Sequence, residues 1–432
     1  MRVGGVVVVS LAAGFLAALI LPFLPASSVD GNFATAMVLF GFAFGWVLLA
    51  VLSRQFTDQP QRWAVVPAIF MAVAAVLLLL APDSVLKVVG WIWPPALVAL
   101  VVWVWIRARR DLHSPTRRLL LNPVLVILVL FTLGGAYETI GRATAPTVTM
   151  QGHLVDVGPY RLHIQCTGSG SPTVILQPGG GGSAASLGLI TPAVAKDSRV
   201  CVYDRAGRGW SDPAATPPDG AQVATDLHNL LARAHAPGPY VLAGHSFGGL
   251  YVRTYAAMYP DQVAGLVLVD STASHNTPVS PQQAGSYSLL HHASSLFAAT
   301  SWLGLGRIVA DNDFAYLPPT YRDDARTTAA TGEEMGGFID EFLIANKSEA
   351  EAGALRDFGD KPLVVLTASS GNSPGWMGDQ NKSATLSTNS IHRVVPGATH
   401  GSFVDNPVHA ATITQAIHDV VVAVRTGAPL KP

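Results

Sequence analysis

The chain has 432 residues, of which half are apolar and only 13% are charged, and its formal net charge is −1. This composition is too apolar for an ordinary soluble enzyme and indicates segments that span a bilayer. The near-zero net charge gives no indication of a nucleic-acid partner. Most of the apolar excess lies before residue 141, whereas the rest of the chain has the mixed composition of a globular domain.

Five apolar stretches in the first 140 residues are each long enough to cross a hydrocarbon core of roughly 30 Å, which takes about 20 helical residues. We expect them at Val3–Leu24, Phe33–Leu52, Trp63–Ala81, Val85–Ile106 and Leu119–Ile140. Five such stretches in succession would leave a soluble helical domain without solvated faces. The sequence therefore predicts a membrane domain over residues 1–141, with about five transmembrane helices in a lipid bilayer.

The charges of the connecting segments predict the orientation of these spans. The segments before the first span, between the second and third, and between the fourth and fifth carry Arg2, Arg54, Arg62, Arg107, Arg109, Arg110, Arg117 and Arg118. The other two connectors, Pro25–Asn32 and Pro82–Ser84, carry neither arginine nor lysine. Arginine and lysine are retained on the cytoplasmic side. We therefore expect a multi-pass cell-membrane protein with a cytoplasmic N-terminus and an extracytoplasmic domain after the fifth span.

Residues 142–150 form a short linker rich in Thr, Ala and Pro. At no more than about 3.5 Å per extended residue, a tether of about ten residues keeps the following domain within about 35 Å of the bilayer. We therefore expect the mouth of any site in that domain to lie near the membrane.

From residue 151 onward, strand-like and helix-like runs alternate, which is typical of a mostly parallel sheet covered by helices on both faces. The strand candidates are Leu154–Val157, Leu162–Cys166, Thr173–Gln177, Val200–Asp204, Tyr240–Ala243, Gly265–Val269, Leu363–Thr367 and His392–Val395. Eight strands suit one sheet, and about 280 residues are enough for a single large core. The sequence therefore predicts one α/β domain over residues 151–432.

The fifth strand candidate runs directly into Gly244-His245-Ser246-Phe247-Gly248, which is a G-x-S-x-G motif. A strand that turns into a helix through a single residue strains that residue, and the flanking positions must be small because two backbones nearly touch. Glycine at 244 and 248 meets this requirement. An apolar strand pattern precedes the motif and an amphipathic stretch follows it, so Ser246 is expected to be an exposed nucleophile.

Three segments together resemble the α/β-hydrolase superfamily: the serine motif GHSFGG, the turn YDRAGRGWSD at residues 203–212, and GATHGSF at residues 397–403. The resemblance covers the exported domain and not the membrane region. It implies an α/β-hydrolase fold, with a mostly parallel eight-stranded sheet and a helical lid. In similar proteins the YDRAGRGWSD segment supports the site, so Asp204 with Arg205 or Arg208 is expected to fix the turn beside the serine.

The superfamily orders its catalytic triad as serine, acid and histidine, which indicates a base late in the chain. His400 follows the final strand candidate in a loop that can carry its ring toward Ser246. Most relatives place the acid after the seventh strand, but Ala368-Ser369-Ser370-Gly371-Asn372 has no carboxylate there. Some relatives place it one strand earlier, where Asp270 lies. We favour Asp270 as the partner of His400, with Asp379 as the alternative.

Two backbone amides are expected to stabilise the oxyanion that forms during acyl transfer. The residue after the nucleophile, Phe247, supplies one. The resemblance places the second in the loop Gln177-Pro178-Gly179-Gly180-Gly181-Gly182, with Gly180 as the donor. A glycine-rich loop can also be a plain flexible connector. We find no His, Cys and carboxylate cluster with zinc spacing, and neither a metal nor an organic cofactor is implied.

About 90 residues separate the sixth and seventh strands, which is too long for a simple connection. We expect a lid insertion over residues 271–361, with helix-like pieces such as Gly336–Asn346. Acidic lid residues receive a substrate amine in related aminopeptidases, and Glu333 with Glu334 is the candidate pair here. An exposed glutamate pair is, however, usually only solvated.

The resemblance also places the two cysteines on neighbouring strands. Cys166 and Cys201 lie in the exported part, where disulfides persist. A bridge and a pair of free buried thiols are both open from sequence. Neither cysteine has the histidine partner of a nucleophile, so no catalytic role is assigned to them.

These expectations combine into a membrane-anchored serine hydrolase that cleaves an ester-like substrate, small or lipid-derived, through an acyl-enzyme on Ser246. An acyltransferase or an aminopeptidase would use the same residues, and product analysis separates these activities. A ligand-binding receptor that signals through the spans is the non-enzymatic alternative. A receptor has no need of the serine motif, the glycine-rich loop and the late histidine all together, so their joint presence argues against this alternative.

Overall fold

The computed structural model describes all residues except 1–2, 24–30, 112–120, 275–293, 295 and 432. The chain divides into two compact units. The first contains residues 1–146, 289–309 and 330–336, and the second contains residues 147–288, 310–329 and 337–432. Several residues used in the sequence predictions lie outside the described part: Arg2, Leu24, Arg117, Arg118 and Leu119.

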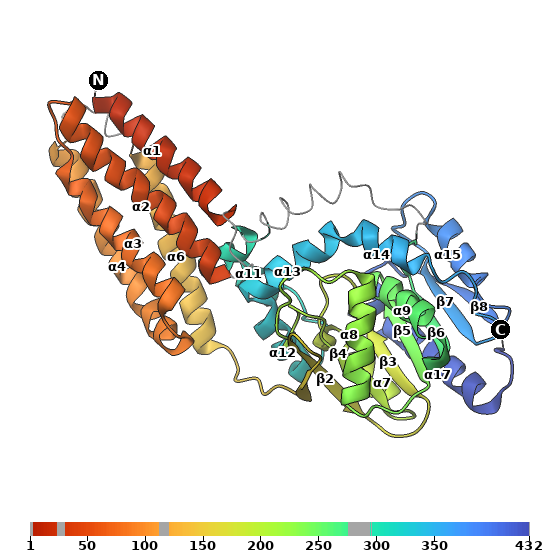
Figure 1. Cartoon of the computed structure of the whole chain (residues 1–432). Coiled ribbons are helices and arrows are strands. Elements are labelled where there is room, and N and C mark those ends of the chain that lie inside the picture. Colours follow the sequence, from red (N-terminus) through yellow and green to blue (C-terminus); the bar gives the residue numbers. More distant parts are fainter. Residues whose placement is uncertain (1–2, 24–30, 112–120, 275–293, 295, 432) are drawn as a thin grey trace. The chain divides into compact units, whose positions relative to one another are not determined.

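The first unit contains five helices that are long and apolar enough to cross a membrane, counted over the described residues. They are α1 (Val3–Ile20), α2 (Gly31–Phe56), α3 (Val65–Leu80), α4 (Asp83–Asp111) and α6 (Asn122–Thr144), with the short turns η1 (Leu21–Phe23) and η2 (Arg62–Ala64). Figure 1 shows these helices lying side by side. The predicted number of long apolar helices and their approximate positions are confirmed.

Small residues let α1 and α2 pack with their backbones in close contact. A Cβ atom added to Gly14 would lie 2.7 Å from the Cα atom of Gly45, and one added to Gly41 would lie 2.1 Å from the nitrogen of Ala18. Helices in membranes lack a hydrophobic driving force for association and rely on such close packing. Gly41 and Gly45 are four residues apart, so they lie on the same face of α2.

The second unit is built on one eight-stranded sheet with the order β1-β2-β4-β3-β5-β6-β7-β8. The strands are β1 (His153–Asp156), β2 (Arg161–Thr167), β3 (Thr173–Gln177), β4 (Val200–Tyr203), β5 (Tyr240–His245), β6 (Val263–Val269), β7 (Leu363–Ala368) and β8 (Ser390–Val395). The β1–β2 and β2–β4 pairs are antiparallel, and the other pairs are parallel. The predicted mostly parallel sheet of the α/β-hydrolase fold is confirmed.

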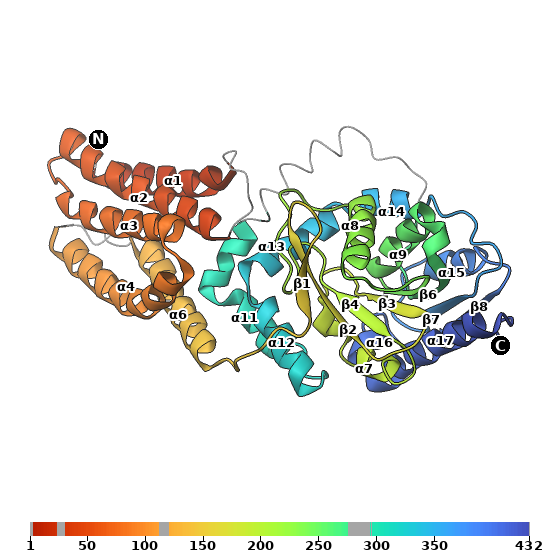
Figure 2. The ribbon, with the colours of Figure 1, turned by 60° about the horizontal axis from the view of Figure 1, so that its bottom comes forward.

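Helices cover both faces of this sheet. The helices of the second unit include α7 (Thr191–Val194), α8 (Gly220–Arg233), α9 (Phe247–Met258), α12 (Pro319–Ala329), α14 (Ala345–Ala352), α15 (Trp376–Ala384), α16 (Ser402–Asp405) and α17 (Pro407–Thr426), with the short turns η3 (Ala184–Leu187) and η4 (Pro260–Gln262). Figure 2 shows α8 and α9 on one side of the sheet and α17 on the other. A parallel sheet must be buried on both faces in this way.

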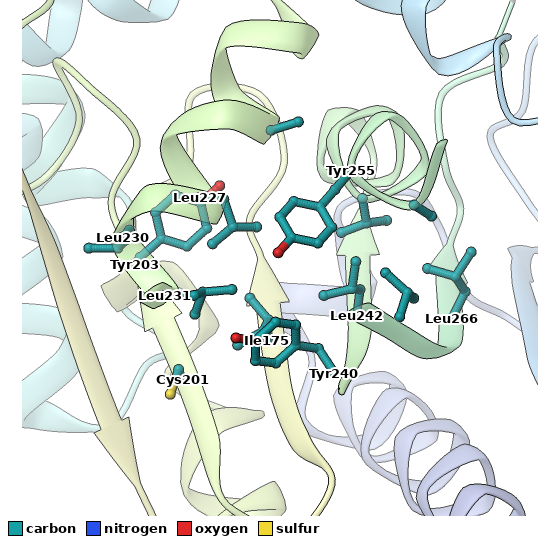
Figure 3. Packing of buried hydrophobic residues seen from close by; sticks show 14 of the residues in the cluster. Ile175, Cys201, Tyr203, Leu227, Leu230, Leu231, Tyr240, Leu242, Tyr255 and Leu266 are labelled. Carbon is teal, nitrogen blue, oxygen red and sulfur yellow. The ribbon is translucent and has the colours of Figure 1, made fainter. Parts of the chain in front are cut away.

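The side chains of the central strands alternate between two buried clusters. Ile175 and Leu242 pack on the face covered by α8 and α9, where Leu227 and Tyr255 meet them (Figure 3). Their neighbours, such as Val174, belong to the cluster on the opposite face, which α17 covers. This period of two is the geometry of a β-strand, and it explains why these strands read as continuous apolar runs in the sequence.

The insertion between β6 and β7 is helical, as predicted, but it does not belong to one unit. It contains η5 (Thr300–Leu303), α11 (Leu305–Asn312), α12, α13 (Gly332–Leu343) and α14. We predicted that all of residues 271–361 belong to the hydrolase domain. Residues 289–309 and 330–336 instead group with the N-terminal helices, because η5 and the start of α11 pack on α2 and α6. The boundaries between the units fall within α11 and α13.

Candidate active site

The predicted catalytic residues follow the carboxyl ends of neighbouring parallel strands in the second unit. Ser246 follows β5, Asp270 follows β6, and His400 lies in the loop after β8. The glycine-rich loop follows β3, which pairs with β5. Since the carboxyl ends of parallel strands lie at one edge of a sheet, side chains distant in sequence meet there.

Ser246 lies in a strained turn between β5 and α9. Its backbone has φ 55° and ψ −123°, in a region that non-glycine residues rarely adopt. A Cβ atom added to Gly244 would lie 2.3 Å from the carbonyl oxygen of Gly248, and one added to Gly248 would lie 2.3 Å from that of Gln177. Both glycines of the motif are therefore required by backbone contact. The turn itself is held by a hydrogen bond from the Ser246 N–H to the carbonyl of Val269, at 3.1 Å.

The structure brings Ser246, His400 and Asp270 into one hydrogen-bonded chain. The Nε2 atom of His400 lies 2.9 Å from the Ser246 hydroxyl oxygen, and its Nδ1 atom lies 2.7 Å from a carboxylate oxygen of Asp270. An ionised carboxylate only accepts hydrogen bonds, so Nδ1 carries the proton. Nε2 is then free to accept the proton of the serine hydroxyl. The His400 side chain is 42% exposed, so a substrate can approach it.

Asp270 is fully buried and has three hydrogen-bond donors. Besides His400, the backbone N–H of Ala368 and the indole N–H of Trp376 donate to it at 3.0 and 2.8 Å. Burial alone would raise the pKa of Asp270, but the hydrogen bonds from His400, Ala368 and Trp376 hold this pKa below its ordinary value. The carboxylate therefore remains ionised at neutral pH. Asp379, the alternative acid, lies in the first turn of α15.

His245, between Gly244 and Ser246, positions the loop that carries His400. Its Nε2 atom lies 3.0 Å from the backbone carbonyl of His400. Burial, together with the neighbouring His400, lowers the pKa of His245 to about 4. The ring is therefore neutral above that pH and donates its Nε2 proton to the carbonyl. No pattern in the sequence indicated this partner, which is 155 residues away.

The glycine-rich loop that carries Gly180 lies against Ser246 and Phe247. A Cβ atom added to Gly179 would lie 3.1 Å from that of Ser246, and one added to Gly180 would lie 2.8 Å from the Phe247 ring. Within the described part of the chain, the backbone N–H groups of Gly180 and Phe247 donate no hydrogen bond. Two unpaired amides beside a nucleophile are what a developing oxyanion requires.

A lid carboxylate and a buried arginine hold this glycine loop. Glu341, on α13, accepts from the N–H of Gly181 and from Nε of Arg205, both at 2.6 Å. Arg205 in turn donates to the carbonyls of Pro178 and Gly179, at 3.0 and 2.9 Å. Because Arg205 binds these carbonyl oxygens, the N–H of Gly180 is left available to a ligand. Burial alone would raise the pKa of Glu341, but the charge of Arg205 holds it low.

The YDRAGRGWSD turn has the supporting role that the resemblance implied. Asp204 accepts from the N–H groups of Ala184 and Trp210, at 2.6 and 3.1 Å, and pairs with Nδ1 of His163 at 2.7 Å. Arg208 also binds the carbonyl of Gly181. These contacts fix the turn against β2 and the loop after β3.

Sequence reasoning missed Glu341 and Trp376. Glu341 is one of four carboxylates on α13, with Glu333, Glu334 and Asp340, and its partner Arg205 is 136 residues away, so no local signal distinguished it. The pair Glu333 and Glu334 lies in the first turn of α13, in the part of that helix that belongs to the first unit. Glu334 is only 8% exposed, which differs from the solvated pair considered as the alternative.

Cys166 and Cys201 form a disulfide that links β2 to β4, where they are direct partners in the register. Of the two states left open by the sequence, the structure therefore has the bridge. Among the described residues, no group of three or more His, Cys, Asp or Glu side chains is arranged to hold a metal ion.

Residues 172–407 match the profile of the α/β hydrolase fold. An uncharacterised protein of Schizosaccharomyces pombe is 31% identical over 42% of this chain and 37% of its own length. An uncharacterised vacuolar membrane protein of Saccharomyces cerevisiae is 31% identical over 34% of this chain and 27% of its own length. The chain thus spans well under half of either relative. A thermophilic esterase from Thermogutta terrifontis is 23% identical, over 61% of this chain and 94% of the esterase, with a TM-score of 0.46.

Proposed function

Because the chain belongs to the α/β hydrolase family, we propose that it is a serine hydrolase that cleaves an ester-like substrate through an acyl-enzyme on Ser246. One observation carries the proposal, namely the hydrogen-bonded chain from Ser246 through His400 to Asp270. A buried ionised carboxylate, a histidine with its proton on Nδ1 and an adjacent hydroxyl are the parts of a nucleophile activated by a general base.

The reaction proceeds in two halves. Nε2 of His400 takes the hydroxyl proton while the Ser246 oxygen attacks the carbonyl carbon, and the carbonyl oxygen becomes an oxyanion held by the amides of Gly180 and Phe247. Collapse of this intermediate expels the alcohol, which receives the proton from His400. Water then attacks the acyl-enzyme with His400 again as the base, which releases the acid and restores the serine.

Asp270 holds the ring of His400 and stabilises the imidazolium form during both halves. Its lowered pKa keeps it ionised, so this support persists throughout the neutral range. Losing one oxyanion donor typically costs about 2.7 to 4 kcal/mol of transition-state stabilisation. Glu341 is a positioning residue in this proposal, because it acts on the loop of Gly180 and not on the substrate.

The substrate class of this proposal is a small or lipid-derived ester at the membrane surface, with the N-terminus in the cytoplasm and the hydrolase domain outside. Two observations support this orientation. Arginines gather in the connectors that would lie on the same side of the membrane as the N-terminus. The Cys166–Cys201 disulfide is a feature of proteins that fold in oxidising compartments.

The proposal is tested by the hydrolysis of esters of graded acyl length by the purified full chain in detergent or lipid. Ser246→Ala is expected to abolish turnover of every ester that the wild type cleaves. Asp270→Asn is expected to lower kcat by about 10⁴-fold, because the amide stabilises the wrong tautomer. Asp379→Asn is the matched control and is expected to retain turnover. Turnover that survives Ser246→Ala, or that depends on Asp379 instead of Asp270, contradicts the proposal.

A further inference from the structure

The first part of the lid packs deep against the helices of the membrane unit. Leu303 lies directly on α6, since a Cβ atom added to Gly134 would be 2.5 Å from its carbonyl oxygen. At the start of α2, the Trp302 indole N–H donates to Asn32 at 3.0 Å. All of these residues belong to the first unit. Residues 298–307 therefore pack against α2 and α6.

The depth of this contact follows from the neighbouring helix α4. The Thr139 hydroxyl of α6 donates to the carbonyl of Gly90, at 3.0 Å. Gly90 lies seven residues after the start of α4 at Asp83, which corresponds to about 10 Å along the helix axis. Glu138, which binds the lid, precedes Thr139, and Gly134 lies further inside along α6. The lid segment therefore reaches about two helical turns past the first residue of α4.

The charged groups of α6 at this level are paired with each other and with Arg307 of α11. Glu138 is 3% exposed, and its carboxylate receives two hydrogen bonds from the guanidinium of Arg307, at 3.0 and 3.2 Å. Arg142 binds the same carboxylate at 2.5 Å and lies over the Trp302 ring at 5.0 Å. Ionised side chains within a membrane are costly unless they pair with one another. This network fixes α11, through Arg307, to α6.

The residues of this segment that face away from the protein are apolar. Phe297, Leu305, Ile308 and Val309 have exposed fractions of 42, 43, 46 and 60%. On α6, Leu133, Tyr137 and Ile140 are exposed to a similar degree, at 62, 40 and 53%. The apolar surface of the lid segment thus continues the lipid-facing surface of a membrane-spanning helix.

We propose that residues 296–309, the first part of the lid, lie within the bilayer leaflet that contains the C-terminal half of α6, with Phe297, Leu305, Ile308 and Val309 in contact with lipid acyl chains. The partner of this surface is the bilayer itself. In a soluble protein, four exposed apolar side chains on one short segment would be a liability for aggregation. In the leaflet, each buries its surface against acyl chains while the ion network remains inside the protein.

The proposal is tested with a fluorophore at a single introduced cysteine. The only two cysteines of the chain form a disulfide, so a new thiol is labelled specifically. Val309→Cys is labelled with a polarity-sensitive dye, and the full chain is placed in phosphatidylcholine vesicles that carry nitroxides on the acyl chains. Ile308→Cys is the second position, in case the first variant fails to fold. Thr320→Cys, exposed on α12 in the second unit, is the control.

At positions 308 and 309 we expect emission shifted to the blue, strong quenching by the acyl nitroxides and protection from aqueous iodide. The label at position 320 is expected to be quenched by iodide. Quenching of positions 308 and 309 by iodide would overturn the proposal, because the surface then faces water. Protection from both quenchers would also overturn it, because protein then covers the surface. Neither readout depends on enzymatic activity, so the result is independent of the proposed hydrolysis.

Discussion

Ser246 combines two requirements that conflict in an ordinary turn, which are an exposed hydroxyl and close contact between two backbones. The strained backbone of Ser246 is held by the close contacts of Gly244 and Gly248 and by two hydrogen bonds: its N–H donates to the carbonyl of Val269, and its carbonyl accepts from the N–H of Thr272. Strain of this kind costs of order 1–3 kcal/mol and persists only where the surrounding structure fixes it. The backbone geometry of Ser246 therefore depends on the neighbouring strand ends and loops at this edge of the sheet, and not on the turn alone.

At neighbouring His245, stability depends on pH in a predictable direction. Its pKa is lowered from the ordinary value of 6.5 to about 4 in the folded chain. Between these values the unfolded chain binds a proton that the folded chain does not, so the free energy of unfolding falls as the pH drops from 6.5 toward 4. The contribution reaches at most about 1.4 kcal/mol per pH unit.

His245→Gln keeps a donor for the His400 carbonyl and removes the titration. We expect the melting temperature of this variant to fall less steeply than that of the wild type between pH 6.5 and 4. His418→Gln, on an exposed part of α17, is the control and should follow the wild type. Thermal unfolding measured at each pH checks this. If the melting temperatures of His245→Gln and the wild type fall equally with pH, the lowered pKa of His245 does not contribute to the pH dependence of stability.

At the scale of elements, α13 connects the lid to the catalytic loop. Glu341 on this helix receives hydrogen bonds from Gly181 and Arg205, and Phe342 packs on Phe247, with ring centroids 4.9 Å apart. The loop that carries Gly180, the proposed oxyanion donor, thus depends on a helix that lies 160 residues away in the sequence.

Glu341→Gln is expected to lower kcat with little change in KM, because the loop positions a group that acts mainly in the transition state. A displacement of about 1 Å can reduce the rate about 100-fold. Glu351→Gln is the matched control, since Glu351 on α14 accepts from the N–H of Ala221 at the start of α8, away from the loop. Steady-state kinetics of both variants on a soluble ester check this. An equal loss of kcat in the control would indicate a general effect of weakening the lid.

The sheet could be predicted from the sequence and the lid only in outline. Each central strand is a continuous apolar run that ends at turn residues, so its bounds are set locally; β3 is predicted to the residue at Thr173–Gln177. The residues Ser246, His400 and Asp270, which the structure joins by hydrogen bonds, could be proposed as a group because each follows a strand end that the sequence marks. The partners of α11 and α13 were not found, because Glu138 and Arg307 are 169 residues apart and no local pattern pairs them.

For the whole molecule, the Cys166–Cys201 disulfide stabilises the second unit by closing a loop of 35 residues. A loop of this length contributes roughly 3 to 4 kcal/mol to the free energy of unfolding in the chain-entropy account. We expect a reductant to lower the melting temperature of the wild type and to leave that of the Cys166→Ala, Cys201→Ala double variant unchanged. The measurement is thermal unfolding with and without reductant. A wild-type melting temperature that does not change with reductant would contradict this role.

The central claim is that one chain joins a membrane unit to a serine nucleophile. It is therefore tested on the full chain. Its most direct test is the reaction of the intact protein in lipid with a fluorophosphonate, followed by peptide mass spectrometry. The account predicts one adduct on Ser246 that parallels the loss of ester hydrolysis and is missing from Ser246→Ala. A folded, active protein that forms no adduct at Ser246, or is inactivated by an adduct at another residue, would contradict it.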